Sequence, residues 1–213
     1  MSANLLNGKE IAQDIFEEVY LKIAELKKSG WQPMLLSIKV GENPAVDLYI
    51  RNQRKKAEQV GIVFEEKKFP KDISLNLLLA AIASFNVDPK VTGIILQRPA
   101  PKNIPIKSLQ KAIHPLKDVE GMHPASIGNI VYNELELGPC TAVASVELLR
   151  HTGKDLKGLE VVVIGHSEIV GKPIAFLLMA EGATVTVCHH MTKDFTVHSK
   201  NADAVFVAVG KPN

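Results

Sequence analysis

The feature that most constrains the fold is a regular alternation of short apolar runs with longer segments of helical periodicity. Apolar runs of strand length end in glycine or polar turns, and the segments between them repeat apolar residues every three or four positions. We expect strands over 34–40, 62–69 and 91–96, and helices over 11–26, 45–60, 75–85 and 106–113. Strands that alternate with helices form a largely parallel sheet through right-handed crossovers. The sequence therefore predicts an α/β fold.

A second alternating unit begins near Pro139, after a turn-rich stretch over 114–128. Thr141 is placed to cap a helix that reaches about His151. We then expect a strand, a helix and two further strands over 160–164, 169–180, 184–188 and 204–209. The pattern predicts an N-terminal α/β domain over 1–138 and a Rossmann-like domain over 139–213. We expect the second domain to be incomplete, truncated after its third strand.

Composition excludes several partner classes. The 25 basic and 23 acidic residues give a net charge of +2, which is too balanced for a nucleic-acid-binding surface. No apolar run approaches membrane-spanning length and the N-terminus lacks a signal-peptide pattern, so we expect no membrane partner. Cys140 and Cys188 form no CxxC pair, and we expect a cytoplasmic protein in a reducing compartment.

Glycines at the start of the second unit indicate a nucleotide-binding loop. Gly165 ends an apolar strand, and Gly171 stands in the first turn of the helix that follows. This layout lets backbone N–H groups and a helix N-terminus meet a pyrophosphate. The pattern is not G-x-G-x-x-G, because Ser167 holds the middle position and the last glycine comes one residue late. From these residues alone, a turn and a packing contact explain the glycines equally well.

The residues that select the cofactor are unusual. A carboxylate that holds the NAD ribose is expected about 20 residues after the first glycine. Cys188, His189 and His190 stand there instead, and no arginine is placed to hold a 2′-phosphate. We therefore expect NADP to bind at least as well as NAD, with NAD possible, and His166 and His190 to make the phosphate contacts.

The seven histidines carry no metal-site spacing such as HExxH. His189 and His190 are the only adjacent pair, and consecutive residues at a strand end point to opposite sides. We expect no metal site.

Several blocks of the chain resemble the methylenetetrahydrofolate dehydrogenase/cyclohydrolase (FolD) family. The blocks fall in the family's order from residue 5 to the last residue, and some read almost as the family's signatures. They are VGENPA over 40–45, KAEQVGI over 56–62, GIILQRPAP over 93–101, PLKDVEG over 115–121, PCT over 139–141, the loop over 165–173, ATVT over 183–186 and AVGKP over 208–212.

The resemblance implies two domains, a first that binds a tetrahydrofolate derivative and a second that binds NAD(P). It also implies a homodimer, which would cover the open edge of a short second sheet. The implied substrate-binding residues are Tyr49, Gln97, Asp118 and Glu120. The implied catalytic residues are Tyr49, Gln53 and Gln97, and the implied cofactor-binding residues are Gly165, His166, Ser167, Ile169, Val170, Gly171 and His190.

One departure from the family pattern bears directly on activity. The family's tyrosine is followed four residues later by a catalytic lysine, and here that residue is Gln53. Positions i and i+4 share a helix face, so Gln53 still accompanies Tyr49. An amide, however, cannot exchange a proton near neutral pH as a tuned lysine can.

Three functions follow from the resemblance. The first is a methylenetetrahydrofolate dehydrogenase with weak or absent cyclohydrolase activity, because hydride transfer needs positioning but no proton from the missing lysine. The second is a non-catalytic folate- or nucleotide-binding paralogue. The third is the bifunctional enzyme, with another group in place of the lysine. We rank them in that order.

Overall fold

The computed structural model describes residues 5–210, and its contacts divide them into two compact units. Residues 9–123 form the first unit. Residues 124–210, together with 5–8, form the second. The segment 124–138 therefore packs with the second unit, although the boundary that the sequence predicts for the functional domains follows residue 138. That boundary remains a prediction, and residues 211 and 212 of the last resemblance block lie outside the described part.

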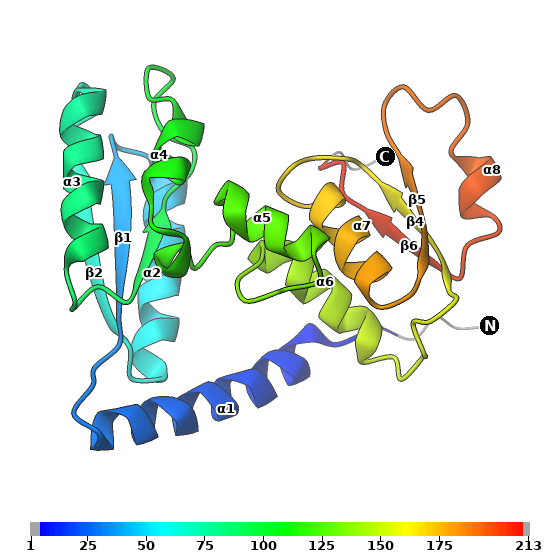
Figure 1. Ribbon diagram of the computed structural model, residues 1–213, viewed down its shortest axis with the longest axis horizontal. Helices are drawn as coiled ribbons and strands as arrows, with labels where there is room; N and C mark the ends of the chain where they lie inside the picture. Colours follow the sequence, from blue (N-terminus) through cyan, green and yellow to red (C-terminus); the bar gives the residue numbers. More distant parts are fainter. Residues whose placement is uncertain (1–4, 211–213) are drawn as a thin grey trace. The chain divides into compact units, whose positions relative to one another are not determined.

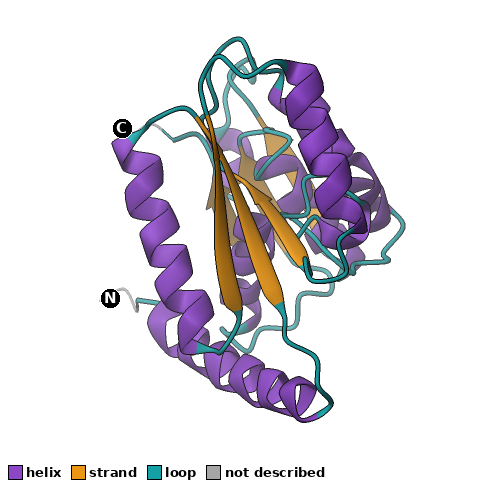
Figure 2. Cartoon of the chain, turned by 90° about the vertical axis from the view of Figure 1, so that its left-hand side faces the viewer, coloured by secondary structure: helices purple, strands orange, loops and turns teal. Residues whose placement is uncertain are grey.

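The first unit is a parallel three-stranded sheet with the order β2-β1-β3. Its elements are α1 (Gly8–Lys28), β1 (Met34–Val40), α2 (Pro44–Gln59), β2 (Val63–Phe69), α3 (Leu75–Val87), β3 (Gly93–Leu96), α4 (Ile106–Ala112) and the 3-10 turn η1 (Pro115–Lys117). Figures 1 and 2 show its strands side by side with helices around them. The predicted parallel α/β arrangement is confirmed.

Helices cover both faces of this sheet. Alternate residues of β1 pack against α3 and α4 in one apolar cluster that includes Leu36, Ile38, Leu78 and Leu109. The opposite face packs against α2 in a second cluster around Ile50. A parallel sheet that is buried on both faces requires nearly continuous apolar strands, and this requirement explains why these strands are visible in the sequence.

The second unit repeats this architecture, with the parallel strand order β5-β4-β6. Its elements are α5 (Pro124–Val131), α6 (Cys140–Arg150), β4 (Glu160–Ile164), α7 (Gly171–Ala180), β5 (Thr184–Cys188), α8 (Thr196–Ser199) and β6 (Ala204–Val207). One apolar cluster joins α5, α6 and α7 to β4. Among the described residues of both units, no helix combines the length and apolarity needed to cross a membrane.

The structure corrects four local predictions. A helix, α5, occupies part of the stretch expected to be turns, and α8 was not expected. Helix α7 begins at Gly171 rather than near Ile169, because the loop continues that far. Thr141 lies inside α6, whose N-cap position is taken by Pro139.

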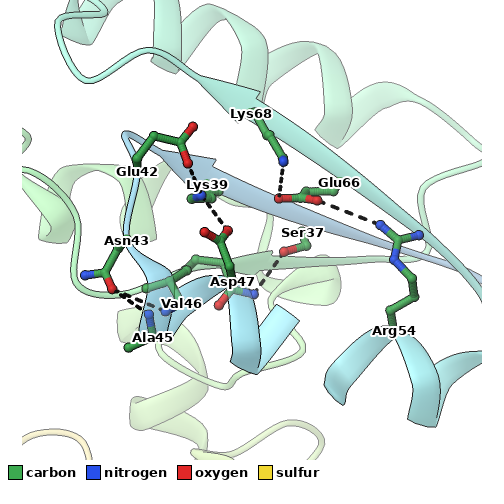
Figure 3. A network of polar contacts seen from close by, with 11 residues as sticks. Ser37, Lys39, Glu42, Asn43, Ala45, Val46, Asp47, Arg54, Glu66 and Lys68 are labelled. Carbon is green, nitrogen blue, oxygen red and sulfur yellow. Dashed lines mark hydrogen bonds and ion pairs between the residues drawn. The ribbon is translucent and has the colours of Figure 1, made fainter. Parts of the chain in front are cut away.

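A buried lysine ties the first turn of α2 to the end of β1. The side chain of Lys39 is 2% exposed, and its Nζ lies 2.5 Å from Asp47 Oδ1 and 2.8 Å from Glu42 Oε2. Figure 3 shows both carboxylates converging on this amine. Burial alone would lower the pKa of Lys39, but the hydrogen bonds that its amine donates to Asp47 and Glu42, together with their charges, outweigh burial and raise it. The hydrogen bond from Lys39 in turn lowers the pKa of Asp47. Lys39 and Asp47 are therefore both charged in the folded protein near neutral pH.

The pH dependence of an Asp47→Asn variant should reveal this ion pair. Because the folded-state pKa of Asp47 lies below its ordinary value of 3.8, its stabilisation is complete above that value and is lost as the pH falls through the folded pKa. We expect the variant's deficit in unfolding free energy to be largest near neutral pH and to shrink in acid. Urea unfolding across pH measures it. Glu18→Gln, in the exposed pair with Lys22, is the control and should change stability little. A deficit that does not vary with pH would contradict the ion-pair account.

Candidate functional site

A chain of amide and hydroxyl groups marks the carboxyl end of β3. Gln97 follows this strand and is 4% exposed, and its backbone N–H donates to Ile38 O at 2.9 Å. Its side-chain Nε2 donates to Ser37 Oγ at 2.9 Å and to Gln53 Oε1 at 2.7 Å. The hydrogen-bond partners decide which amide atom is nitrogen. Residues from β1, α2 and the end of β3 therefore meet at Gln97.

Local sequence explains how α2 delivers Gln53. Asn43 caps the helix by accepting from the N–H groups of Ala45 and Val46 at 3.0 and 3.3 Å, and Pro44 occupies the first turn. The buried residues Val46, Ile50 and Ala57 form the stripe that faces the sheet. Gln53 falls on the same stripe at helical spacing, which is why its amide reaches Gln97.

Tyr49 lies one helical turn before Gln53 on α2 and is 56% exposed. An exposed aromatic ring one turn from the half-buried Gln53 amide suits a residue that borders a ring-containing substrate. Its substrate contact remains a prediction.

Glu120 reaches the same strand end from the loop after η1. The Leu96 N–H donates to its Oε2 at 3.2 Å, and Arg98 Nη2 lies 3.8 Å from its Oε1. Burial raises the pKa of this carboxyl above its ordinary value, against the lowering effects of Arg98 and of the Leu96 N–H. A carboxyl group with a raised pKa can both hold and release a proton closer to neutral pH.

Asp118 has a different environment from Glu120. It is 3% exposed, its Oδ2 accepts the His123 N–H at 2.5 Å, and its backbone pairs with Ile94 beside β3. These contacts fix the loop that carries Glu120. The direct substrate contact predicted for Asp118 remains a prediction.

In the second unit, backbone crowding explains both glycines of the predicted loop. Gly165 has φ +115°, and a Cβ at this position would lie 2.5 Å from Ala208 O. A Cβ at Gly171 would lie 1.9 Å from Gly165 O, so the first residue of α7 packs directly on the loop. Tight turning and close helix packing are the roles that glycines play in dinucleotide-binding loops. This bare backbone before a ten-residue helix fits a pyrophosphate.

The rest of the loop is ordered by its own hydrogen bonds. Ser167 Oγ accepts the Val170 N–H at 3.2 Å, and Ser167 O accepts the Lys172 N–H at 3.1 Å. Ser167, Glu168 and Ile169 are exposed on this loop. They are available to a nucleotide, and the binding roles of Ser167, Ile169 and Val170 remain predictions.

Three histidines gather beside this loop, contrary to the expectation that His189 and His190 diverge. Strand β5 ends at Cys188, so the alternation of a strand no longer applies to the two residues after it. The rings of His166 and His189 stack with centroids 4.5 Å apart, and His190 lies 6.0 Å from His166. Desolvation, and then electrostatic interactions with His189, Lys172 and His190, lower the pKa of His166.

A separate surface hollow of about 500 Å³ lies between α1 and α2. It includes none of the residues predicted to bind substrate or cofactor. Its lining residues are Gln13, Phe16, Glu17, Tyr20, Leu21, Lys56, Gln59 and Val60.

Two domain descriptions of one known family match this chain. Residues 6–120 match the description "Tetrahydrofolate dehydrogenase/cyclohydrolase, catalytic domain", and residues 139–213 match "Tetrahydrofolate dehydrogenase/cyclohydrolase, NAD(P)-binding domain". The "Bifunctional protein FolD 2" of Mesorhizobium japonicum is 65% identical over 207 residues, which cover 97% of this chain and 68% of that protein.

Solved structures agree with these matches. The bifunctional enzyme FolD, methylenetetrahydrofolate dehydrogenase/cyclohydrolase, from Campylobacter jejuni is 39% identical, with a TM-score of 0.95 over 100% of this chain and 76% of that one. The Trypanosoma brucei methylenetetrahydrofolate dehydrogenase-cyclohydrolase, complexed with NADP cofactor and inhibitor, is 32% identical. Its TM-score is 0.91, and the match covers 100% of this chain and 74% of that one.

Proposed function

This chain belongs to the tetrahydrofolate dehydrogenase/cyclohydrolase family, and on that premise we propose that it oxidises methylenetetrahydrofolate with NADP and hydrolyses the methenyl product. The observation that carries the proposal is the arrangement at the end of β3. There the Gln97 amide donates to Gln53 Oε1, and the N–H of the preceding residue, Leu96, donates to Glu120 Oε2. The second unit supplies the NAD(P)-binding domain of the family.

Oxidation removes a hydride from the methylene carbon and leaves a methenyl cation, so it needs positioning more than proton transfer. NADP held at the Gly165 loop would accept the hydride. In the first unit, the hydrogen bond from Gln97 holds the Gln53 amide in one orientation, with Tyr49 one turn away. These side chains orient the folate without exchanging protons.

Hydrolysis, unlike oxidation, requires proton transfer by the protein. A base must take a proton from the attacking water, and an acid must return a proton to the ring nitrogen that leaves as the C–N bond breaks. We assign both tasks to Glu120, because burial raises its pKa and because it lies at the same strand end as Gln97. Glu120 thereby takes over the proton handling that the missing lysine performs in the family pattern.

This proposal moves the bifunctional enzyme from the third place that it held from sequence alone to the first. The relatives named above are described as bifunctional or as dehydrogenase/cyclohydrolases, and they favour the two-activity enzyme over a dehydrogenase with weak hydrolysis. The dehydrogenase-only enzyme stays as the second candidate, because Gln53 replaces the lysine. An assay of NADP reduction in the presence of methylenetetrahydrofolate tests the oxidation that both candidates share. The predicted homodimer is retained as a proposal from the family resemblance.

Histidine substitutions should separate the two cofactors. If His166 and His190 contact the 2′-phosphate, replacing both by alanine should weaken NADP binding roughly tenfold or more, because hydrogen bonds to charged groups contribute about 1.5–3 kcal/mol. NAD binding should change much less. Fluorescence titration with each nucleotide measures the two affinities, with His198→Ala as the control on α8. A wild-type preference for NAD that survives the double substitution would contradict the assignment.

A further inference from the structure

The cluster of His166, His189 and His190 is positioned by the backbone of the second sheet. Strands β4 and β5 are parallel neighbours in register, with Ile164 opposite Cys188. The Gly165 N–H donates to Cys188 O at 2.7 Å, which carries the pairing one step beyond β4. His166 directly follows Gly165, and His189 directly follows Cys188. The pairing of the two strands therefore sets the separation of these histidines.

The ring geometry brings one nitrogen from each imidazole within 4.8 Å of the other two. Metal–imidazole bonds of about 2.0–2.1 Å hold the ligand nitrogens of one ion no more than about 4 Å apart. Rotation of the side chains can close this small difference, because His166 and His190 are exposed and His189 is half-buried. The backbone need not move.

His189 is the most constrained of the three. Its Nδ1 accepts the Met191 N–H at 3.2 Å, and its own N–H donates to Thr192 Oγ1 at 2.9 Å. Binding through Nδ1 would replace one long hydrogen bond in an exposed turn, which contributes little in water. The second contact, from the backbone, would keep the residue in place.

We propose that His166, His189 and His190 form a three-imidazole site for a divalent transition-metal ion of the zinc class. Imidazole nitrogens favour zinc, copper, nickel or cobalt ions over magnesium and calcium, which prefer oxygen ligands. Three protein ligands leave a fourth position of a tetrahedral ion open to water or another ligand. This site goes beyond the proposed function and revises the expectation from sequence that no metal site exists.

A metal ion at these three histidines would affect cofactor binding under the proposed function, but the metal site does not require that function. Under that function, His166 and His190 contact the cofactor's phosphate. A bound metal ion would occupy nitrogens that those contacts need. The metal test below therefore uses the ion alone, without folate or nucleotide, so that its failure and the failure of the proposed function are distinguishable.

Calorimetric titration of the tag-free protein with Zn²⁺ tests the site. We expect about one ion per chain, and at least a tenfold loss of affinity in each of His166→Asn, His189→Asn and His190→Asn. His198→Asn, an exposed histidine of the same unit, is the matched control and should bind as wild type does. Circular dichroism of each variant shows that a loss of binding is not a loss of folding.

Titration with Cu²⁺ adds a readout of the ligands themselves. Its electron paramagnetic resonance spectrum should show nitrogen coupling in wild type that weakens in each of the three variants but not in His198→Asn. Absence of stoichiometric Zn²⁺ binding would overturn the proposal, as would equal losses in the control. Binding of inorganic phosphate, rather than Zn²⁺, that is lost in the three variants would overturn it in favour of an anion site.

Discussion

Glu120→Gln should slow the hydrolysis of methenyltetrahydrofolate by about a hundred- to ten-thousand-fold, the usual contribution of general acid–base catalysis. The amide keeps the size of the side chain but cannot exchange a proton. Oxidation of methylenetetrahydrofolate needs no proton from this residue, so its rate should change much less. Separate assays of the two half-reactions measure the contrast, and Glu120→Asp, which keeps the acid, should lose less hydrolysis than the glutamine variant.

A second variant, Gln53→Lys, distinguishes the two candidate functions. If Glu120 handles the protons, restoring lysine should change hydrolysis little. If the missing lysine limits hydrolysis, the same substitution should accelerate it by about a hundredfold or more. A large gain in Gln53→Lys, together with no loss in Glu120→Gln, would contradict the role given to Glu120.

Gly171→Ala should destabilise the second unit and impair its binding of NADP. The new Cβ would lie 1.9 Å from Gly165 O and 2.6 Å from Gly165 C, and both are backbone atoms that cannot rotate away. The loop or the start of α7 must shift, and forced overpacking typically costs about 1–3 kcal/mol and occasionally more. Because the displaced backbone is the predicted phosphate-binding loop, the affinity for NADP should fall as well.

Urea unfolding and nucleotide titration measure the two effects. Gly128→Ala is the matched control, since Gly128 lies on helix α5 of the same unit and a Cβ there has nothing within 4 Å. Alanine favours a helix over glycine by roughly 1 kcal/mol, so this control should be neutral or slightly stabilising. Equal effects of the two substitutions would show that close packing at Gly171 has no special role.

Much of the fold was predictable because its strands are short apolar runs between clear turns. The predicted bounds of β1, β4 and β5 are those of the structure. Helix α5 was missed because Pro124, Gly128 and Asn129 resemble turn residues, whereas the burial of Ile130 against the second core favours a helix there. Tertiary packing, rather than the local sequence pattern, makes this segment helical.

The candidate site was predictable in part through the family resemblance, which implied the roles of Gln53 and Gln97. Helical spacing then placed Gln53 on the same face as Tyr49, and Gln97 directly follows an apolar run of strand length. The hydrogen bond between Glu120 and the Leu96 N–H depends on how the loop after η1 folds, which local patterns do not determine. The histidine cluster was missed because strand alternation was extended past Cys188, where β5 has already ended.

An absorbance assay of the unmodified protein tests both proposed activities at once. Methylenetetrahydrofolate is mixed with NADP, and absorbance follows NADPH formation, the appearance of the methenyl compound and its decay as separate signals. We expect protein-dependent NADPH formation, together with methenyl decay faster than in buffer alone. Methenyl that accumulates and decays only at the buffer rate would contradict the hydrolytic half of the claim. Absence of NADPH formation would contradict the claim as a whole.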